Sequence, residues 1–322
     1  MESQKQLCRA ALLCSLLLNG GCSEGEIELD HDEPAGDATI PDSEQWTIES
    51  QITNRTYQIQ VSFPREYDTV SVPYQAVYLL DANGQFGMTT EIVRNLTYFD
   101  ADSSRGLIVV GVGYPVGAFY NALGVRVLDL TPHSDATWDS ILVAVAPEVH
   151  PVVSGDAAGF LDFLSRELIP RVESDYRVDG STRTVIGHSL GGLFALYALL
   201  EQPEAFQQYL VISPSLWWKC GDDTTVCLED ASAPDGWVLR REEELYEAGS
   251  RLSGRLYLTV GDEEIPTMIE GPRRLAARLQ LRDYADLDWT FQMIPGEWHM
   301  SIPPSAISAG LRWLHFDSGA DR

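Results

Sequence analysis

A serine inside a glycine-rich turn is the residue whose surroundings most suggest chemistry. Ser189 is the central residue of Gly187–Gly192 (GHSLGG), which fits the pattern G-x-S-x-G. Residues 184–186 before it predict a short strand, and residues 190–200 after it predict a helix. A strand, a tight turn and a helix expose such a serine as a nucleophile. A second match, at residues 21–25, has neither element around it, so we assign it no catalytic role.

The same turn predicts where an oxyanion is stabilised. Glycines flank the serine because larger side chains would collide in so tight a turn, and the hydroxyl then stands beside a helix N-terminus. The helix dipole and the Leu190 N–H favour a negative oxygen there. A second donor is expected from residues 80–84 (LDANG), which follow a predicted buried strand. We assign it to the backbone N–H of Asn83, with Ala82 as the alternative.

A histidine must act as the base, because a serine hydroxyl is a poor nucleophile until its proton is removed. Of the six histidines, His299 has the expected position, in Pro295–Ser301 (PGEWHMS) directly after the last predicted strand. His315 falls in the closing helix, where a surface or packing role is expected. His188 adjoins the serine, but its side chain should point away, so we interpret it as structural.

The acid of a Ser–acid–His series should follow the strand that ends at Val260. The chain there reads Gly261-Asp262-Glu263-Glu264, so three carboxylates compete. A Gly-x-x-acid spacing selects Glu264. Asp262 and Glu263 remain alternatives, and so does an arrangement without an acid.

Two features predict contacts with a substrate. Trp217 and Trp218 follow the strand after the nucleophile, near the sheet edge where ligands bind. They form an aromatic wall for an aryl ester, or one of them packs into the core. Arg126 either binds an anionic substrate or pairs with Asp129. The rest of the body lacks a cationic cluster, which disfavours a polyanionic substrate.

These residues require a sheet that brings several strand ends together. Alternating polarity predicts antiparallel strands at residues 46–52 and 57–63, and continuous apolar runs predict buried strands at residues 75–80 and 107–112. Further strands are predicted at residues 184–186, 209–212, 256–260 and 289–294, and helices at residues 86–99, 160–168, 190–200, 267–281 and 304–314. Strands that alternate with helices imply a mainly parallel sheet with helices on both faces and an antiparallel start.

One segment fits neither a strand nor a helix pattern. Residues 115–153 are rich in Pro, Gly and Asp, and we expect them to form a long irregular excursion on the surface. Long loops of this kind are usually functional or disordered.

Charge and composition exclude several classes of partner. The 322 residues carry a formal net charge of -26, with 22 Lys and Arg against 48 Asp and Glu. So few cations cannot neutralise a phosphate backbone, which argues against nucleic acid, and the same sign argues against docking on an anionic membrane. High negative charge favours a soluble monomer.

The N-terminus predicts export. Lys5 and Arg9 precede the apolar stretch Ala10–Leu18, which is far too short to span a bilayer at roughly 20 residues, and Cys22 follows two glycines. Residues 1–22 therefore resemble a signal peptide of the bacterial lipoprotein type, with cleavage without lipidation as the alternative. Residues 23–45 are acidic and poor in aromatic residues, as in a flexible tether, and residues 46–322 form the folded domain. The expected location is the periplasm, the membrane surface through a lipid on Cys22, or the medium.

The cysteines outside the signal are few. Cys220 and Cys227 are two of five, and in an oxidising compartment such a close pair forms a disulfide or stays as two unrelated thiols. Zinc is not expected, because no second Cys or His pair has ligand spacing.

Four segments together resemble one family. They are GHSLGGLFALY at residues 187–197, SPSLWW at 213–218, PGEWHMS at 295–301 and RVLDLTP at 126–132. They are similar to the putative-esterase family, which includes enterochelin esterases, IroE-like periplasmic siderophore esterases, feruloyl esterases and mycolyltransferases. The resemblance covers about residues 47–316 and is strongest for the IroE-like members. It implies an α/β-hydrolase fold with Ser189 as nucleophile and His299 as base, and a Ser–His dyad in some members.

The sequence therefore predicts hydrolysis of a small-molecule carboxylic ester through an acyl-serine, without a metal or cofactor. An acyltransferase would use the same residues, and a serine peptidase would share the chemistry. A binding protein without catalysis is the least favoured alternative, because Ser189 and His299 are both present.

Overall fold

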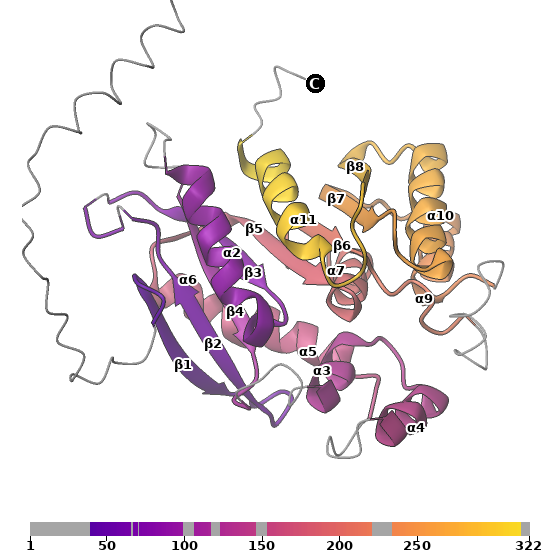
Figure 1. Cartoon of the computed structure of the whole chain (residues 1–322), viewed down its shortest axis with the longest axis horizontal. Helices are drawn as coiled ribbons and strands as arrows, with labels where there is room; N and C mark the ends of the chain where they lie inside the picture. Colours follow the sequence, from indigo (N-terminus) through magenta and orange to yellow (C-terminus); the bar gives the residue numbers. More distant parts are fainter. Residues whose placement is uncertain are drawn as a thin grey trace, which may run out of the picture. The chain divides into compact units, whose positions relative to one another are not determined.

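The fold is built on one eight-stranded sheet. The computed structural model describes residues 39–65, 67–69, 71–98, 106–116, 123–145, 153–220 and 234–316. Within these residues the strand order is β1-β2-β4-β3-β5-β6-β7-β8 (Figure 1). The pairs β1–β2 and β2–β4 are antiparallel, and every other pair is parallel. The strands are β1 (Ser43–Glu49), β2 (Thr56–Ser62), β3 (Tyr74–Leu79), β4 (Leu107–Gly113), β5 (Val178–His188), β6 (Gln208–Ile212), β7 (Ser253–Gly261) and β8 (Asp286–Ile294).

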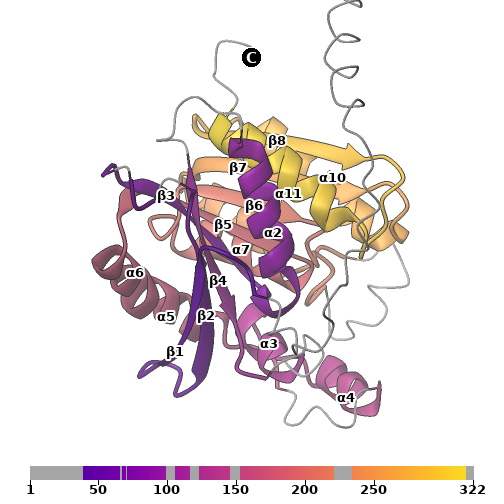
Figure 2. The same ribbon diagram turned by 60° about the vertical axis from the view of Figure 1, so that its left-hand side comes forward.

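Helices cover both faces of this sheet. Figures 1 and 2 show α2 and α11 side by side on one face, and the remaining helices lie on the other face or beyond the strand ends. The helices are α2 (Ala82–Thr97), α3 (Leu123–Leu130), α4 (Ala136–Val145), α5 (Ala157–Phe163), α6 (Ile169–Asp175), α7 (Leu190–Glu201), α9 (Trp237–Glu247), α10 (Pro266–Arg282) and α11 (Ile302–Leu311), with π-helical turns at Leu164–Leu168 and Arg312–Phe316. The predicted mainly parallel sheet with an antiparallel start is confirmed.

The core divides into two layers because the central strands are apolar on both sides. Every residue of β4 is buried, and β4 pairs with β3 in a register that sets Val77 beside Val109. One layer lies under α2 and α11, while the other packs against α5, α7 and α10. The helix α7 is buried along nearly its whole length, so the residue that precedes it is fixed by the core.

The structure corrects the prediction for residues 115–153. Its described part contains two helices, α3 and α4, rather than an irregular excursion. In α3, Val127 and Leu130 face the core at helical spacing, together with the buried Arg126 and Asp129. The Pro, Gly and Asp residues around these helices concealed this pattern in the sequence.

Two further differences concern the start of the first strand and a helix that was not predicted. The first strand begins at Ser43, so the folded part starts before the predicted residue 46. The helix α9 was not predicted, although its residues Trp237–Leu239 are buried against the core. Elsewhere the predicted strands and helices occur with shifted ends, and the strand predicted at residues 184–186 is the much longer β5, which begins at Val178.

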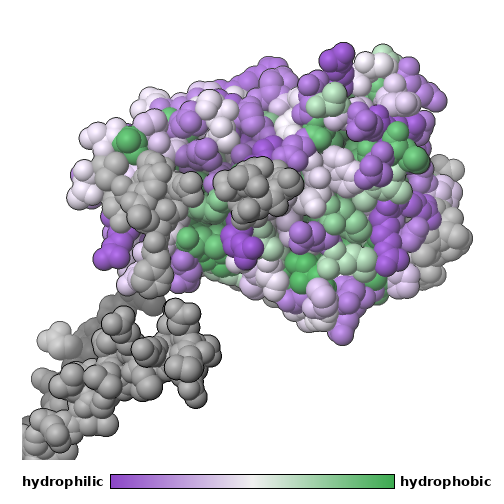
Figure 3. Space-filling model, turned by 90° about the horizontal axis from the view of Figure 1, so that it is seen from above, coloured by the Kyte–Doolittle hydropathy of each residue, from purple (hydrophilic) through white to green (hydrophobic). Residues whose placement is uncertain are grey.

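Residues Ile40–Arg322 group into one compact unit. The predicted signal at residues 1–22, and residues 23–38 of the predicted tether, lie outside the described residues. Within the part of the chain that the structure describes, no helix is long and apolar enough to cross a membrane. On the face seen in Figure 3 hydrophilic residues predominate and hydrophobic ones are interspersed.

Candidate active site

The glycine-rich turn places Ser189 between β5 and α7. The strand ends at His188 and the helix begins at Leu190, so Ser189 alone forms the turn, with φ 61° and ψ −118°. A Cβ on Gly187 would lie 2.0 Å from the Gly191 carbonyl oxygen, which leaves no room for any other residue there. The Ser189 N–H donates to the Ile212 carbonyl at 3.0 Å and so ties the turn to the end of β6. The turn is strained, as expected where a side chain is held exposed for chemistry.

The imidazole of His299 lies between the serine and a carboxylate. His299 follows β8, and its Nε2 is 3.0 Å from Ser189 Oγ. Its Nδ1 is 2.9 Å from Glu264 Oε2. These distances suit a base that takes the serine proton while the carboxylate fixes its tautomer.

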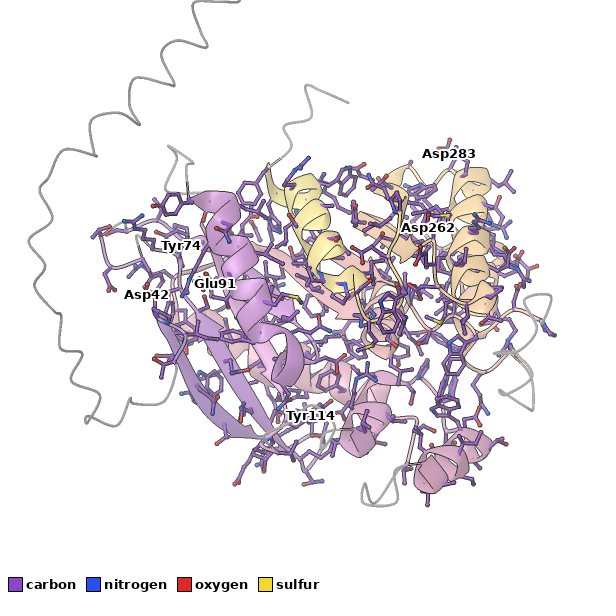
Figure 4. All side chains as sticks on the ribbon, viewed as in Figure 1. Asp42, Tyr74, Glu91, Tyr114, Asp262 and Asp283 are labelled. Carbon is purple, nitrogen blue, oxygen red and sulfur yellow. The ribbon has the colours of Figure 1, made fainter. Side chains whose placement is uncertain are left out.

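Glu264, rather than its neighbours, reaches this histidine. Its Oε1 accepts hydrogen bonds from the Gly261 N–H at 3.2 Å and from the Ser213 hydroxyl, and the side chain is buried. Asp262 is exposed and instead accepts from the Gly296 N–H at 2.7 Å; Figure 4 marks it beside β7 and β8. The Gly-x-x-acid spacing identified the carboxylate that reaches His299, because the tight turn after β7 folds Glu264 back onto the Gly261 N–H.

The second expected oxyanion donor, the N–H of Asn83, lies at the start of α2. Asp81 caps this helix in a left-handed conformation, with φ 55° and ψ 36°. The Asn83 amide clamps Tyr114, marked in Figure 4, by donating to its carbonyl at 2.7 Å and accepting from its N–H at 2.8 Å. Backbone N–H groups in a first helical turn have no intrahelical partner. The N–H groups of Asn83 and Leu190 both belong to such turns, at the starts of α2 and α7.

Arg126 pairs with Asp81, a partner that was not predicted. Its Nε donates to Asp81 Oδ1 at 2.6 Å, and its Nη2 donates to Asp81 Oδ2 at 3.0 Å. The pair is buried, and Arg126 lines the same cavity as Ser189. It therefore holds the Asp81 turn and places positive charge near the serine, instead of pairing with Asp129.

Asp129 anchors α3 to the sheet. It lies 2.7 Å from the Arg55 guanidinium, and Tyr114 and Tyr57 donate to it at 3.0 and 3.5 Å. Burial nevertheless dominates and raises the pKa of Asp129 to about 7. Since α3 also carries Arg126, this cluster fixes the helix from which the arginine reaches Asp81.

Two cavities open on either side of the serine and histidine. The larger, about 500 Å³, is lined mainly by apolar side chains: Met88, Leu123, Met300, Pro303 and Pro304. The smaller, about 300 Å³, is lined by Trp217, Met268, Ile265 and Trp298, with Glu263 and Glu264. An ester bound at Ser189 can therefore place its acyl part in one cavity and its alcohol part in the other.

Trp217 and Trp218 have different surroundings. Trp217 lines the smaller cavity and directs its indole N–H to Met268 Sδ at 3.2 Å. Trp218 is fully buried, and its N–H donates to the His133 carbonyl at 3.3 Å. The prediction that Trp218 contacts a substrate is thus wrong, because its ring packs in the core and faces neither cavity.

Three exposed apolar side chains at the cavities were not predicted. Ile265, Trp298 and Met300 are 53%, 54% and 57% exposed, and all three line the cavities beside His299, as at a ligand-binding groove. Trp298 and Met300 flank His299 in the segment PGEWHMS, so proximity to the predicted base was the signal that could have identified them.

His188 and His315 are not placed to act as bases. The His188 ring packs against that of His299, with centroids 4.6 Å apart, and burial together with the nearby His299 and Arg126 lowers its pKa to about 3. His315 hydrogen-bonds Thr184 Oγ at 3.0 Å and Gln75 Oε1 at 2.7 Å, and its pKa falls to about 4 because of burial. Both are packing residues, as the sequence indicated.

Cys220 takes part in a disulfide bond. Its predicted partner, Cys227, lies outside the described residues. Within those ranges no three or more His, Cys, Asp or Glu are grouped so that they could hold a metal ion.

The chain is similar in sequence to known proteins. The sequence model of the family described as "Putative esterase" matches residues 50–282. Ferri-bacillibactin esterase BesA of Bacillus subtilis (strain 168) is 30% identical over 290 residues, which cover 87% of this chain and 92% of that protein. The siderophore enterobactin esterase of Emericella nidulans is 36% identical over 285 residues, with coverage of 80% and 89%.

A solved structure is also similar to this chain. The crystal structure of the BES protein from Bacillus cereus has a TM-score of 0.71 at 30% identity and covers 88% of this chain and 99% of that one. The predicted α/β-hydrolase fold is confirmed.

Proposed function

The chain belongs to the Putative esterase family and is a serine ester hydrolase, and we propose that its substrates are siderophore-type esters cleaved through an acyl-Ser189 intermediate. The observation that carries the proposal is the hydrogen-bonded series from Ser189 through His299 to Glu264. The similar proteins are named as siderophore esterases, which suggests the substrate class.

The reaction begins with attack on the ester carbonyl. Ser189 Oγ forms a bond to the carbonyl carbon while its proton passes to His299 Nε2. Glu264 holds the Nδ1–H and stabilises the imidazolium that results. The N–H groups of Leu190 and Asn83 stabilise the oxyanion, and Arg126 supports the Asp81 turn from which the Asn83 N–H comes.

The acyl-enzyme then forms and is hydrolysed. The bond to the alcohol oxygen breaks as His299 returns its proton to that oxygen. Water next gives a proton to His299 and attacks the acyl carbon. The bond from that carbon to Ser189 Oγ then breaks, His299 returns the proton to Oγ, and the acid is released. The two cavities beside the serine suit an ester with sizeable groups on both sides of the scissile bond.

A panel of esters tests this proposal. We expect cyclic trilactones of catechol-bearing serine to be hydrolysed with a kcat/KM at least about tenfold above that of 4-nitrophenyl or feruloyl esters. This expectation follows because remote binding energy can be used at the reacting centre. Hydrolysis of simple aryl esters alone, with no turnover of trilactones, would contradict the substrate class.

We also propose that the protein is exported and acts as a monomer. The positive residues, short apolar stretch and Gly-Gly-Cys of residues 1–22 support removal of this segment, with Cys22 as the lipid attachment site. Mass spectrometry of the N-terminus from a bacterial host should find a chain that begins at or near Cys22. An intact Met1 would reject export. Light scattering should give the mass of one chain.

A further inference from the structure

Few charges line the two cavities, and their sum is negative. Among the described residues that form the cavity walls, the charged side chains other than histidine are Arg126, Glu263 and Glu264. Arg126 is held by both oxygens of the buried Asp81, which offsets its positive charge. Glu264 hydrogen-bonds His299, and Glu263 is exposed at the smaller cavity.

The surroundings add more negative charge. Hydrogen bonds from the Ser301 and Ser305 hydroxyls lower the pKa of Glu297, which precedes the cavity residue Trp298. Asp262 is exposed at the turn before Glu263. The single lysine outside the first 22 residues, Lys219, lies 3.8 Å from Asp135.

The whole chain carries a net charge of -26, so the long-range field also repels anions.

We propose that the active site selects esters by charge and hydrolyses uncharged esters in preference to anionic ones. Resting on the proposed function, this names the substrates as siderophore esters without net negative charge: an iron-free lactone with protonated catechols, or a neutral ferric tris-hydroxamate ester. A trianionic ferric tris-catecholate is disfavoured, because its negative charges would lie close to the carboxylates at the smaller cavity.

An isosteric pair of esters tests this inference independently of siderophores. The butyrate esters of 3-hydroxybenzamide and 3-hydroxybenzoate differ by one negative charge, and their rates are divided by those of hydroxide-catalysed hydrolysis. We expect the kcat/KM of the amide ester to exceed that of the carboxylate ester about tenfold at low salt. The ratio should narrow at about 0.5 M salt, where charges are screened within a few ångströms. A ratio near one, or one that salt does not change, would overturn the inference.

A charge-reversal variant locates the effect at the site. Glu263→Lys should lower the ratio of the two esters at least about threefold. Glu247→Lys is the matched control, because Glu247 is an exposed residue at the end of α9 and lines neither cavity. Equal effects of both variants would assign selectivity to the overall charge of the chain and reject a role for the cavities.

The same enzyme is then given a catechol trilactone with and without ferric ion. Faster hydrolysis of the iron-free form supports the inference, and faster hydrolysis of the ferric form contradicts it. If neither form is hydrolysed, catechol trilactones are rejected as substrates, while the benzamide–benzoate pair still decides charge selectivity.

Discussion

At the scale of residues, local sequence identified Ser189 and His299, and the structure brings these two together with Glu264. A nucleophile in a glycine-rich turn has a strong local pattern, because steric crowding at Gly187 permits no other residue. The acid has a weaker pattern, since three adjacent carboxylates share the loop. Which carboxylate reaches His299 depends on how that loop turns and on the hydroxyl of Ser213, directly after β6, and no local sequence pattern shows either.

The first residue-scale prediction concerns this acid. Glu264→Ala should lower kcat about 10²–10⁴-fold, because His299 loses the group that fixes its tautomer. Asp262→Ala should change kcat less than about fivefold, since Asp262 hydrogen-bonds Gly296 and not His299. Steady-state assays with 4-nitrophenyl butyrate measure both. Loss of activity in Asp262→Ala with Glu264→Ala unaffected would move the acid to Asp262.

Arg126 gives the second prediction. From the sequence its loss would matter for anionic substrates only, but its two bonds to Asp81 make it a support of the turn that carries Asn83. Arg126→Gln should therefore lower kcat on neutral and anionic esters alike, by about 10²-fold. Breaking a buried pair also costs about 3–5 kcal/mol of stability, so circular dichroism must accompany the assay.

Arg55→Gln provides the comparison, because Arg55 also pairs with a buried aspartate, Asp129, but lines neither cavity. It should lower stability with a smaller effect on kcat. If Arg126→Gln lowered kcat on anionic esters only, the interpretation that Arg126 binds an anionic substrate would be supported instead.

At the scale of elements, the sheet and its major helices were predictable because each has a regular apolar pattern. The helices α3 and α4 were not, since their residues lie among Pro, Gly and Asp and their burial depends on partners distant in the chain. Trp138 of α4 packs against Trp217 and Trp218, with ring centroids 5.0 and 6.3 Å away. These contacts connect α4 to the wall of the smaller cavity.

The two tryptophans should therefore respond differently to truncation. Trp217→Ala should reduce kcat/KM for aryl esters about tenfold more than for acetyl esters, because an aromatic face of the cavity is lost. Trp218→Ala should lower the free energy of unfolding by about 3–5 kcal/mol with no preference among esters. Chemical denaturation and a two-ester assay measure the two effects. Equal changes in ester preference would contradict the separation of roles.

At the scale of the whole molecule, acid stability depends on histidines held neutral inside the fold. The pKa of His315 is lowered to about 4 in the folded protein, from an unfolded value of about 6.5. Its contribution is present above pH about 6.5 and is lost as the pH falls toward 4, because the unfolded chain then binds the proton more tightly.

Denaturation across this range tests the assignment. Between pH 8 and pH 4.5 the free energy of unfolding of the native protein should fall by about 1–3 kcal/mol more than that of His315→Gln. Parallel pH profiles for the two proteins would show that His315 does not titrate with folding.

The central claim is that Ser189 forms the covalent intermediate, and fluorophosphonate labelling tests it most directly. After reaction, peptide mass spectrometry should find one phosphonylated residue, Ser189, with loss of esterase activity in step with labelling. Ser189→Ala should neither react nor hydrolyse esters, with activity lowered about 10⁴–10⁶-fold, while Ser305→Ala should react normally. A label on another residue, or a Ser189→Ala variant that keeps more than a few per cent of activity, would contradict the account.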